Sequence, residues 1–278
     1  MKLGVGGLSS HIMVFDSGIG GTTVLEHIKD LLPQAELSYF MDNAYLPYGK
    51  LSQETIVARL TSLLHYITAH QLKVDVLVIA CNTASTLALA KIRELTSIPV
   101  VGVVPAIKPA TLLTQTQRIG LLATPATISN CYTQQLIALY GEGLTVDLYS
   151  SVELVAIAEQ FYFTGEFNQA KFAKEMQKLA IKPSTDVLVL GCTHFPILAK
   201  QIDNYYNGTI KLMDSGAAIA KRVVAVLAEK NGSEQLVSNI EAIHTKQKKP
   251  LHYYATASVL TNKLIVEHVK LIDLSLNA

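Results

Sequence analysis

Two short runs of this chain are apolar at almost every position, and a cysteine follows each directly. Val74–Ala80 reads VDVLVIA before Cys81, and Thr185–Gly191 reads TDVLVLG before Cys192. Strands that are apolar on both faces need cover on both faces, as parallel strands between two layers of helices have. The two cysteines are 111 residues apart, which is about the size of a small domain. The repeat therefore predicts two similar α/β domains, each with a cysteine at the carboxyl end of a buried strand.

Short β-branched runs alternate with segments of helical spacing along most of the 278 residues. This alternation predicts an α/β protein of two similar three-layer domains with mainly parallel sheets. The predicted strands are His11–Phe15, Glu36–Met41, Val74–Ala80, Pro99–Val101, Arg118–Leu122, Leu144–Tyr149, Asp186–Leu190 and Ile210–Met213. The predicted helical segments include Leu51–Ala69, Ala84–Leu95, Pro125–Tyr140 and Phe167–Leu179. Ligands of such folds bind beyond the carboxyl ends of the strands.

Composition narrows the class of partner and the compartment. Half of the residues are hydrophobic and 16% are charged, which excludes an intrinsically disordered chain. The net charge of +1 provides no general attraction for nucleic acid or an anionic membrane. No stretch approaches the roughly 20 apolar residues that cross a bilayer, and residues 1–10 have no apolar signal segment. We therefore expect a cytoplasmic protein with neither a nucleic-acid nor a membrane partner.

The cysteines suggest chemistry rather than cross-linking. Cys81, Cys131 and Cys192 form no CxxC pair, which argues against a disulfide framework and against a thiolate zinc site. Cys131 lies within a helical pattern, and we assign it a structural role. Cys81 and Cys192 are each expected near a helix N-terminus, where the helix dipole would lower the thiol pKa. Residues expected to cap these helices are Asn82, Thr83 and Thr193.

Two thiols suit a reaction that inverts a carbon bearing an acidic proton, because one removes the proton and the other supplies it to the opposite face. A thiol serves as a base when ionised and as an acid when protonated. A single nucleophilic cysteine with a histidine base is the competing interpretation. His194, two residues after Cys192, could polarise that thiol or bind an acidic substrate.

Loops at other strand ends could bind an anion. Asp16–Gly21 (DSGIGG) follows the first strand, and its glycines and hydroxyl could surround an anion with N–H groups. It does not match the dinucleotide fingerprint, and the chain contains no P-loop sequence. Asp42–Gly49 is a loop whose N–H groups could meet a carboxylate. Thr124 and Thr127 are predicted as helix caps, ligand donors or both.

With these residues assembled, the chain resembles the glutamate racemases of the cofactor-independent aspartate/glutamate racemase superfamily. The resemblance extends from about His11 to about Leu227 and then fades. The motifs that carry it are VFDSGIGG at Val14–Gly21, DNAYLPYG at Asp42–Gly49, ACNTAS at Ala80–Ser85 and GCTHFPIL at Gly191–Leu198. It implies interconversion of L- and D-glutamate without pyridoxal phosphate or metal, supplying D-glutamate for peptidoglycan. It also implies a discontinuous first domain (1–104 and 214–278), an inserted second domain (105–213) and an active site in the cleft between them.

The resemblance implies a role for each matching residue. Cys81 would deprotonate D-glutamate and Cys192 L-glutamate, while Asp16, Glu159 and His194 would assist. The implied substrate-binding residues are Asp16, Ser17, Pro47, Tyr48, Gly49, Asn82, Thr83, Thr124, Thr127, Thr193 and His194. One segment departs from the family pattern: Ser151-Val152 stands where a Cys-Pro pair is common, although the spacing to Glu159 is kept.

Other interpretations stay open at this point. Aspartate or another acidic amino acid could be the substrate, since pocket size decides between them. A non-catalytic protein that binds acidic ligands would also use the loop donors, but it would not need two thiols. A homodimer is left open. The segment Glu241–Pro250, with Lys246, Lys248 and Lys249, is predicted to be an exposed connection.

Overall fold

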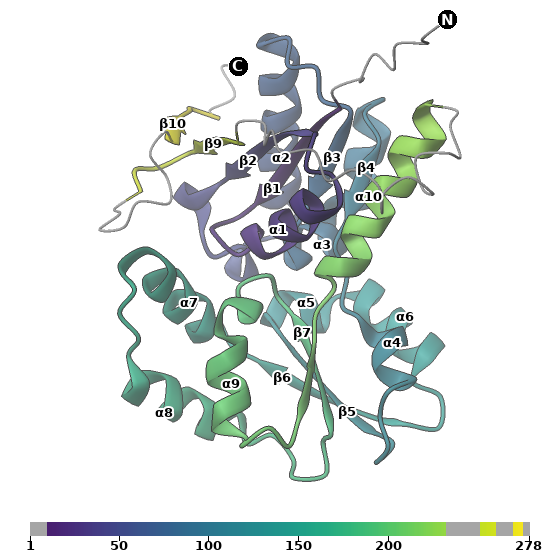
Figure 1. The fold of residues 1–278 in the computed structure, drawn as a ribbon, viewed down its shortest axis with the longest axis vertical. Helices are drawn as coiled ribbons and strands as arrows, with labels where there is room; N and C mark the ends of the chain where they lie inside the picture. Colours follow the sequence, from purple (N-terminus) through teal and green to yellow (C-terminus); the bar gives the residue numbers. More distant parts are fainter. Residues whose placement is uncertain (1–9, 232–250, 260–268, 275–278) are drawn as a thin grey trace, which may run out of the picture.

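The fold contains two parallel sheets, as the alternating pattern predicts (Figure 1). The structure is a computed structural model that describes residues 10–231, 251–259 and 269–274. Its strands are β1 (His11–Asp16), β2 (Glu36–Met41), β3 (Val76–Ile79), β4 (Val100–Gly102), β5 (Arg118–Ala123), β6 (Thr145–Ser150), β7 (Val187–Gly191), β8 (Lys211–Met213), β9 (Leu251–Ala255) and β10 (Val269–Leu271). The first sheet has the order β10-β9-β2-β1-β3-β4 and the second the order β6-β5-β7-β8. Every strand pair is parallel.

Helices cover both sheets. Those that pack with the first sheet are α1 (Thr22–Leu31), α2 (Gln53–Ala69), α3 (Asn82–Leu95) and α10 (Gly216–Asn231). Those that pack with the second are α4 (Ile107–Thr111), α5 (Pro125–Ser129), α6 (Cys131–Tyr140), α7 (Glu153–Thr164), α8 (Gln169–Leu179) and α9 (Ala199–Tyr205). Short 3-10 helices are η1 (Asn43–Tyr45), η2 (Tyr48–Lys50) and η3 (Phe195–Leu198). No helix within the described ranges is long and apolar enough to span a membrane.

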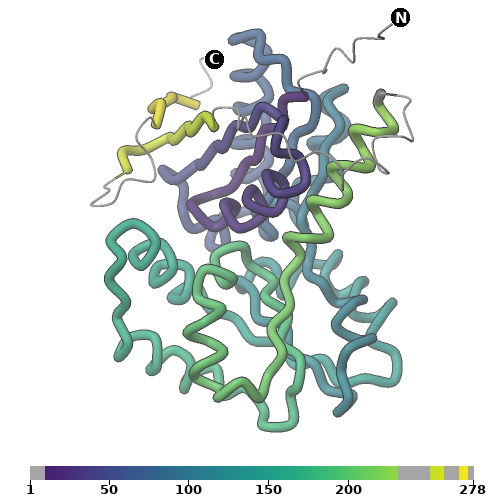
Figure 2. Tube along the Cα trace, viewed as in Figure 1, coloured from purple at the N-terminus to yellow at the C-terminus, as the bar shows by residue number. Residues whose placement is uncertain are grey.

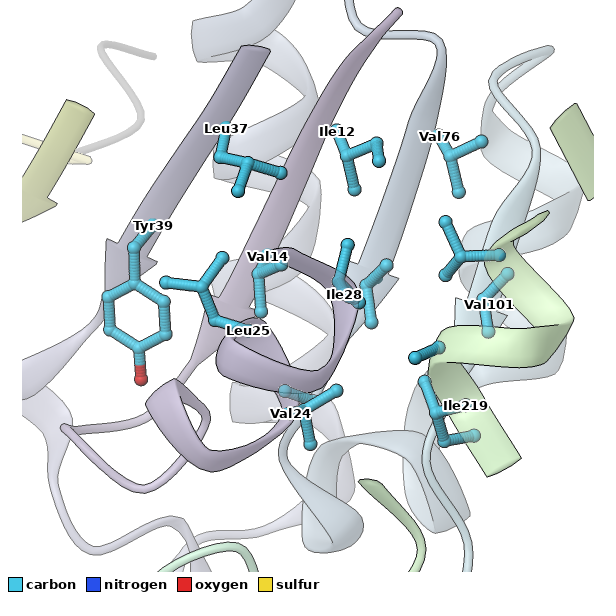
Figure 3. Packing of buried hydrophobic residues seen from close by; sticks show 14 of the residues in the cluster. Ile12, Val14, Val24, Leu25, Ile28, Leu37, Tyr39, Val76, Val101 and Ile219 are labelled. Atoms are coloured by element: carbon cyan, nitrogen blue, oxygen red, sulfur yellow. The ribbon is translucent and has the colours of Figure 1, made fainter. Parts of the chain in front are cut away.

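Alternate residues of each central strand point to opposite layers. Ile12 and Val14 pack with α1 and α10, as Figure 3 shows, and Met13 and Phe15 pack with α2 and α3. The second sheet is covered in the same way, by α7 to α9 and η3 on one face and by α4 and α6 on the other. Each sheet is thus the middle of three layers, which explains why the central strands β3 (VLVI) and β7 (VLVLG) are apolar throughout.

The repeated cysteine motif reflects a repeated topology. The orders β2-β1-β3-β4 and β6-β5-β7-β8 match strand for strand, so β3 and β7 occupy equivalent places. The chain passes between the two halves after β4 and again after β8 (Figure 2). The Ser215 hydroxyl donates to the Val104 carbonyl at 2.6 Å, which ties the two crossings together. The domain bounds 1–104 with 214–278, and 105–213, stay a prediction.

The structure also differs from the sequence predictions in places. The eight predicted strands are present to within two residues, but β9 and β10 were not predicted. The predicted helix over Pro125–Tyr140 is wrong as one element, because Asn130 ends α5 and its side chain accepts from the Tyr132 N–H at the start of α6. Cys131 is therefore the exposed first residue of α6 rather than lying inside a helix. Glu241–Pro250 lies outside the described residues.

The packing predicts where the fold is sensitive. Ile28 of α1 is fully buried against the first sheet, so Ile28→Ala should lower the free energy of unfolding by about 2–5 kcal/mol through lost apolar contact and a cavity. Urea titration measures this. Leu139→Ala on α6, where the side chain is 67% exposed, is the control and should change it by under about 0.5 kcal/mol. Equal effects of the two would contradict the assigned core.

Candidate active site

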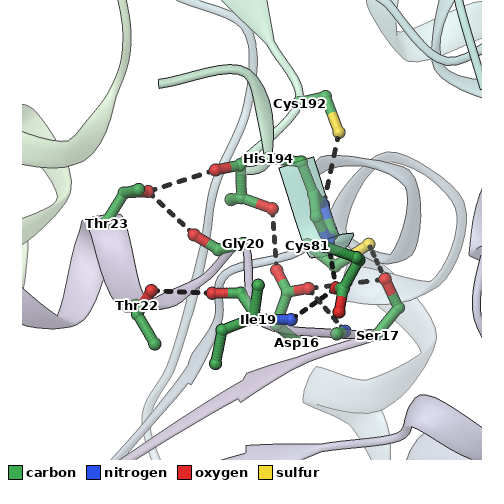
Figure 4. Close-up of polar contacts among 12 residues, drawn as sticks. Asp16, Ser17, Ile19, Gly20, Thr22, Thr23, Cys81, Cys192 and His194 are labelled. Atoms are coloured by element: carbon green, nitrogen blue, oxygen red, sulfur yellow. Dashed lines mark hydrogen bonds and ion pairs between the residues drawn. The ribbon is translucent and has the colours of Figure 1, made fainter. Parts of the chain in front are cut away.

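Cys81 and Cys192 lie at the carboxyl ends of equivalent strands, as the sequence predicts. Cys81 comes two residues after the end of β3, and Cys192 follows β7 directly. Both thiols are buried, at 5% and 7% exposure, in a group of polar side chains drawn from both sheets (Figure 4). Buried polar groups of this number need either mutual hydrogen bonds or a ligand.

The Cys81 side of the group is built by the loop after β1. The Ser17 hydroxyl lies 3.7 Å from the Cys81 sulfur and 3.4 Å from Asp16 Oδ1. The Gly18 N–H donates to the same Asp16 oxygen at 2.9 Å, which fixes the carboxylate at the turn. A thiol, a hydroxyl and a carboxylate thus form one chain of contacts.

The Cys192 side has an equivalent chain built from the second sheet. His194 Nδ1 lies 3.8 Å from the Cys192 sulfur, and His194 Nε2 lies 2.6 Å from Glu159 Oε1 on α7. The same Glu159 oxygen accepts from the Ile19 N–H of the β1 loop at 2.8 Å. Glu159 therefore orients the histidine and also links α7 to the first sheet.

Four contacts between the halves involve threonines. The Thr193 hydroxyl donates to Asp16 Oδ2 at 2.8 Å, and the Thr23 hydroxyl donates to the Thr193 carbonyl at 3.3 Å. The hydroxyl of Thr83 lies 2.9 Å from that of Thr124 and 3.1 Å from that of Thr127. The residues that the sequence singled out from separate motifs are therefore neighbours.

The loop Asp42–Gly49 closes on this group from the first sheet. A Cβ added to Gly49 would lie 2.7 Å from the Thr124 Cβ, so only glycine allows this approach. The Tyr48 hydroxyl donates to Asp42 Oδ2 at 2.6 Å and is not directed at a ligand. Because Tyr48 and Gly49 begin η2, their N–H groups are those that a helix start leaves free for other partners. Pro47 precedes them.

Within the site, one buried polar group has no partner in the described part of the chain. It is Asn82 Nδ2, on a residue that is 4% exposed. Asn82 lines a cavity of about 10 Å³ together with Cys192 and Thr193. A cavity of that size holds no more than about one water, so an amino acid would enter only if the surrounding side chains moved apart. A separate cavity of about 810 Å³ lies at the opposite ends of β7 and β8, beside Asp186 and Lys211.

Burial controls the protonation of the site. Burial, together with the charge of Asp16, raises the pKa of the Cys81 thiol, so the predicted lowering by the helix dipole is wrong there. The Ala84 N–H in the first turn of α3 does favour the thiolate, but it is outweighed. Burial also raises the pKa of Asp16. The pKa of His194 is raised as well, because its contacts with Cys192 and Glu159 outweigh its burial.

The predicted helix caps are correct only in part. Thr124 caps α5 by accepting from the Thr127 N–H at 3.2 Å. Asn82 and Thr83 are not caps, because α3 starts at Asn82 itself and Cys81 is the N-cap residue. Thr193 is not a cap either, since its hydroxyl is bound to Asp16. These three side chains are thereby turned toward the site rather than toward their own helices.

The comparisons with known proteins agree on one family. The model of the Asp/Glu/hydantoin racemase family matches residues 22–223. A glutamate racemase of Shewanella sp. (strain MR-4) is 43% identical over 247 residues, 87% of this chain and 90% of that protein. One of Shewanella baltica (strain OS185) is 46% identical over 224 residues, 81% of each chain. The chain belongs to the Asp/Glu/hydantoin racemase family.

Solved structures of the Asp/Glu/hydantoin racemase family share this fold. Glutamate racemase of Escherichia coli, in complex with L-glutamate and the activator UDP-MurNAc-Ala, is similar with a TM-score of 0.78 and 34% identity, covering 90% of each chain. Glutamate racemase of Francisella tularensis, in complex with D-glutamate, is similar with a TM-score of 0.73 and 27% identity, covering 96% of this chain and 98% of that one. The two-sheet architecture of the family therefore extends over nearly the whole chain.

Several residues that contribute contacts to the site were not predicted from the sequence. Thr23 and the Ile19 N–H make contacts between the halves that no motif indicated. The Tyr39 hydroxyl donates to the Gly18 carbonyl at 2.6 Å and supports the β1 loop from β2. Tyr39 sits within an ordinary strand pattern, so no local signal could have found it. Glu159 was found only through the family resemblance.

Glu159 should stabilise the fold in a pH-dependent way. The folded-state pKa of His194 is raised above its ordinary value of 6.5, so the contribution of its pair with Glu159 is complete below about pH 6.5 and is lost as pH rises through the raised pKa. The difference in free energy of unfolding between wild type and Glu159→Gln should therefore be largest near pH 6 and shrink as pH rises through the raised pKa of His194. Urea titrations across this range measure it. A difference that grows with pH would refute the assignment.

Proposed function

We propose that the chain is a glutamate racemase that moves a proton to and from the α-carbon with two cysteines. The observation that carries this is the placement of Cys81 and Cys192 at equivalent strand ends in one polar cluster. Each thiol is backed by its own carboxylate, Asp16 through Ser17 and Glu159 through His194. Two separate acid–base chains are what a reaction with two proton transfers needs.

In the proposed reaction, one cysteine accepts the α-proton as thiolate and the other donates its proton to the opposite face of the carbon. Cys192 deprotonates L-glutamate and Cys81 deprotonates D-glutamate. One proton is taken up and one released in each turnover, so the two cysteines exchange protonation states. No electron acceptor is required, and the step needs no pyridoxal phosphate.

Asp16 and His194 are proposed to exchange protons with the two thiols. The raised pKa of Cys81 means that its proton rests on sulfur before substrate binds. Asp16, whose own pKa burial raises, lies behind Ser17 and is placed to take that proton. On the other side, the raised pKa of His194 favours an imidazolium, which lies beside the Cys192 sulfur. The two thiols thus have different neighbours, a hydroxyl backed by Asp16 at Cys81 and the His194 ring at Cys192.

We assign substrate binding to the hydrogen-bond donors that surround the two thiols. The proposed donors to the two carboxylates of glutamate are the unpaired Asn82 amide, the N–H groups of Tyr48 and Gly49, and the hydroxyls of Thr83, Thr124 and Thr127. The Thr193 hydroxyl joins them only on leaving Asp16, to which it donates. A carbanion beside a carboxylate is costly in water. Fixed amide and hydroxyl donors from Asn82 and the threonines, in a closed site that excludes water, reduce that cost.

The proposed product is D-glutamate for peptidoglycan, made in the cytoplasm. A reducing compartment suits the mechanism, since an oxidised cysteine can neither accept nor donate a proton. The relatives of known structure bind L- or D-glutamate. Their similarity over nine-tenths of this chain supports the same substrate here.

Replacing either thiol should stop the reaction. Cys81→Ala and Cys192→Ala are each expected to reduce racemisation of L-glutamate at least about 100-fold, because each removes one of two obligatory acid–base groups. Circular dichroism follows the change of optical rotation, and nuclear magnetic resonance in deuterium oxide follows entry of solvent deuterium at the α-carbon.

Cys131→Ala provides the matched control, since Cys131 is exposed and lies on α6 away from the polar cluster. It should retain wild-type activity. Racemisation at the wild-type rate by either of the other two mutants would rule out the two-cysteine mechanism. Absence of α-proton exchange in the wild-type protein with any acidic amino acid would instead favour a non-catalytic binding protein.

Substrate length should be tested separately. We expect kcat/KM for L-glutamate to exceed that for L-aspartate at least about tenfold, because one methylene in a fitted pocket changes binding by about 1–3 kcal/mol. Initial rates by circular dichroism with the two amino acids give the ratio. A ratio in favour of aspartate would reassign the substrate and leave the mechanism in place.

A further inference from the structure

A buried carboxylate outside the polar cluster makes four hydrogen bonds that connect three parts of the chain. Asp42, at the start of the loop Asp42–Gly49, is fully buried. Its Oδ2 accepts from Arg59 Nε at 2.8 Å and from the Tyr48 hydroxyl at 2.6 Å. Its Oδ1 accepts from Arg59 Nη2 at 2.8 Å and from the Thr256 hydroxyl at 2.8 Å. A buried charge needs this many partners, and it holds them firmly because each bond is charge-assisted.

One branch of this network leads into the active site. Tyr48 is 1% exposed, and its ring packs near Phe15 of β1 with 6.2 Å between centroids. Its hydroxyl bond to Asp42 fixes the ring, and the ring fixes the backbone of Tyr48 and Gly49. That backbone faces Thr124 of the second sheet, at the approach that only glycine allows. A small movement at Asp42 would therefore shift the N–H groups proposed to bind a substrate carboxylate.

The other branches lead to the end of the chain. Arg59 Nη1 donates to the Leu274 carbonyl at 3.2 Å, and the Arg59 guanidinium lies 4.0 Å from the ring centroid of Tyr45. The Thr256 hydroxyl also accepts from the Ala44 N–H at 3.0 Å. Asn43 Oδ1 accepts from the N–H groups of Thr256 and Ala257 at 3.1 and 2.9 Å. The turn that starts the substrate loop thus rests on the segment that follows β9.

The residues that support the Asp42 turn from the C-terminal segment lie outside the region that the family model matches. The matched region ends at residue 223, whereas Thr256 and Leu274 lie beyond it. Asp42 and Arg59 lie inside it. The hydrogen bonds of Thr256 and Leu274 therefore join this ion pair, within the matched region, to a segment that the family model does not cover.

We propose that Asp42 and Arg59 are positioning residues of the active site, and that Thr256 completes them by fixing Asp42 from the C-terminal segment. They touch no reacting atom and act through Tyr48 and Gly49. The inference rests on the proposed function, because it assigns the loop to glutamate binding. It adds that binding strength depends on a hydroxyl more than 200 residues away in sequence.

Thr256→Val tests this with little change of shape, since it exchanges a hydroxyl for a methyl group. Loss of one charge-assisted bond should raise KM for glutamate about tenfold and leave kcat within about twofold, because loop N–H groups that bind the carboxylate equally in ground and transition states affect binding alone. Thr256→Ser keeps the hydroxyl and should restore KM. Arg59→Lys keeps the charge but loses the paired N–H donors, so its KM should rise further.

Thr61→Val is the matched control. Thr61 lies on α2, the helix of Arg59, and its hydroxyl donates only to the Val57 carbonyl of that helix, at 2.8 Å. Its KM should equal that of the wild type. Circular dichroism checks that each variant is folded, and calorimetry with racemic glutamate, whose composition turnover does not change, measures Kd.

The outcomes separate the two proposals. If folded Thr256→Val and Arg59→Lys bind and turn over glutamate like Thr61→Val, the positioning role is refuted while the function stands. If their kcat falls with KM and Kd unchanged, the network does not position the binding loop and the inference is again wrong. If Thr256→Val does not fold, Tyr48→Phe cuts the same connection from the other side, and an unchanged Kd there refutes the inference. A wild-type protein without racemase activity refutes the proposed function and the inference with it.

Discussion

Both faces of both sheets are occupied by apolar side chains, and this constraint determines where polar chemistry can take place. Ile12 and Met13 are adjacent in β1 and equally buried, yet they belong to cores on opposite sides of the sheet. No polar functional group can project from the middle of such a strand without a cost in desolvation. The ends of the strands are free of this restriction. Asp16, Cys81 and Cys192 all lie there, and the cluster forms because the ends of two sheets converge.

The site itself is unusual in how much ionisable chemistry it removes from water. Asp16, Cys81 and His194 are each buried, and each has a pKa displaced upward. Protons are therefore retained inside the cluster, where short contacts allow them to be redistributed. The charges that remain are balanced locally, by Thr193 and Gly18 at Asp16 and by Glu159 at His194. Such local balance allows Asp16 and the His194–Glu159 pair to lie in one site away from solvent.

The sequence predicted the fold well because its strongest signals are local. Runs such as VLVI in β3 are a clear signal, because a short segment that is apolar at every position is expected to be a strand buried on both faces. The strand β9 gave no such signal, because LHYYA is short, polar in part and only half-buried, one strand in from the edge of the sheet. Asn130 was equally hard to interpret, since the same residue fits a helix interior poorly and a helix start well.

The motifs of the site were predicted from the sequence, but the direction of the Cys81 pKa shift was not. Spacing placed Cys81 beside a helix start, and the helix dipole alone would lower its pKa. Burial beside Asp16 reverses that direction, and burial is a property of the assembled halves rather than of the motif. Contacts across long separations, such as Glu159 with Ile19 or Thr256 with Asp42, are likewise products of the tertiary fold. A single sequence contains no local trace of them.

The order of strands along the chain also bears on how the protein is made. The second sheet is built from one continuous stretch, β5 to β8, whereas the first takes β9 and β10 from the end of the chain. During synthesis the inserted half can therefore fold while the first sheet still lacks two strands. Until Leu251–Ala255 has left the ribosome, β2 is an open edge and Asp42 lacks its bond from Thr256. Residues 251–256 thus cover the edge of β2 and complete the support of the substrate loop together.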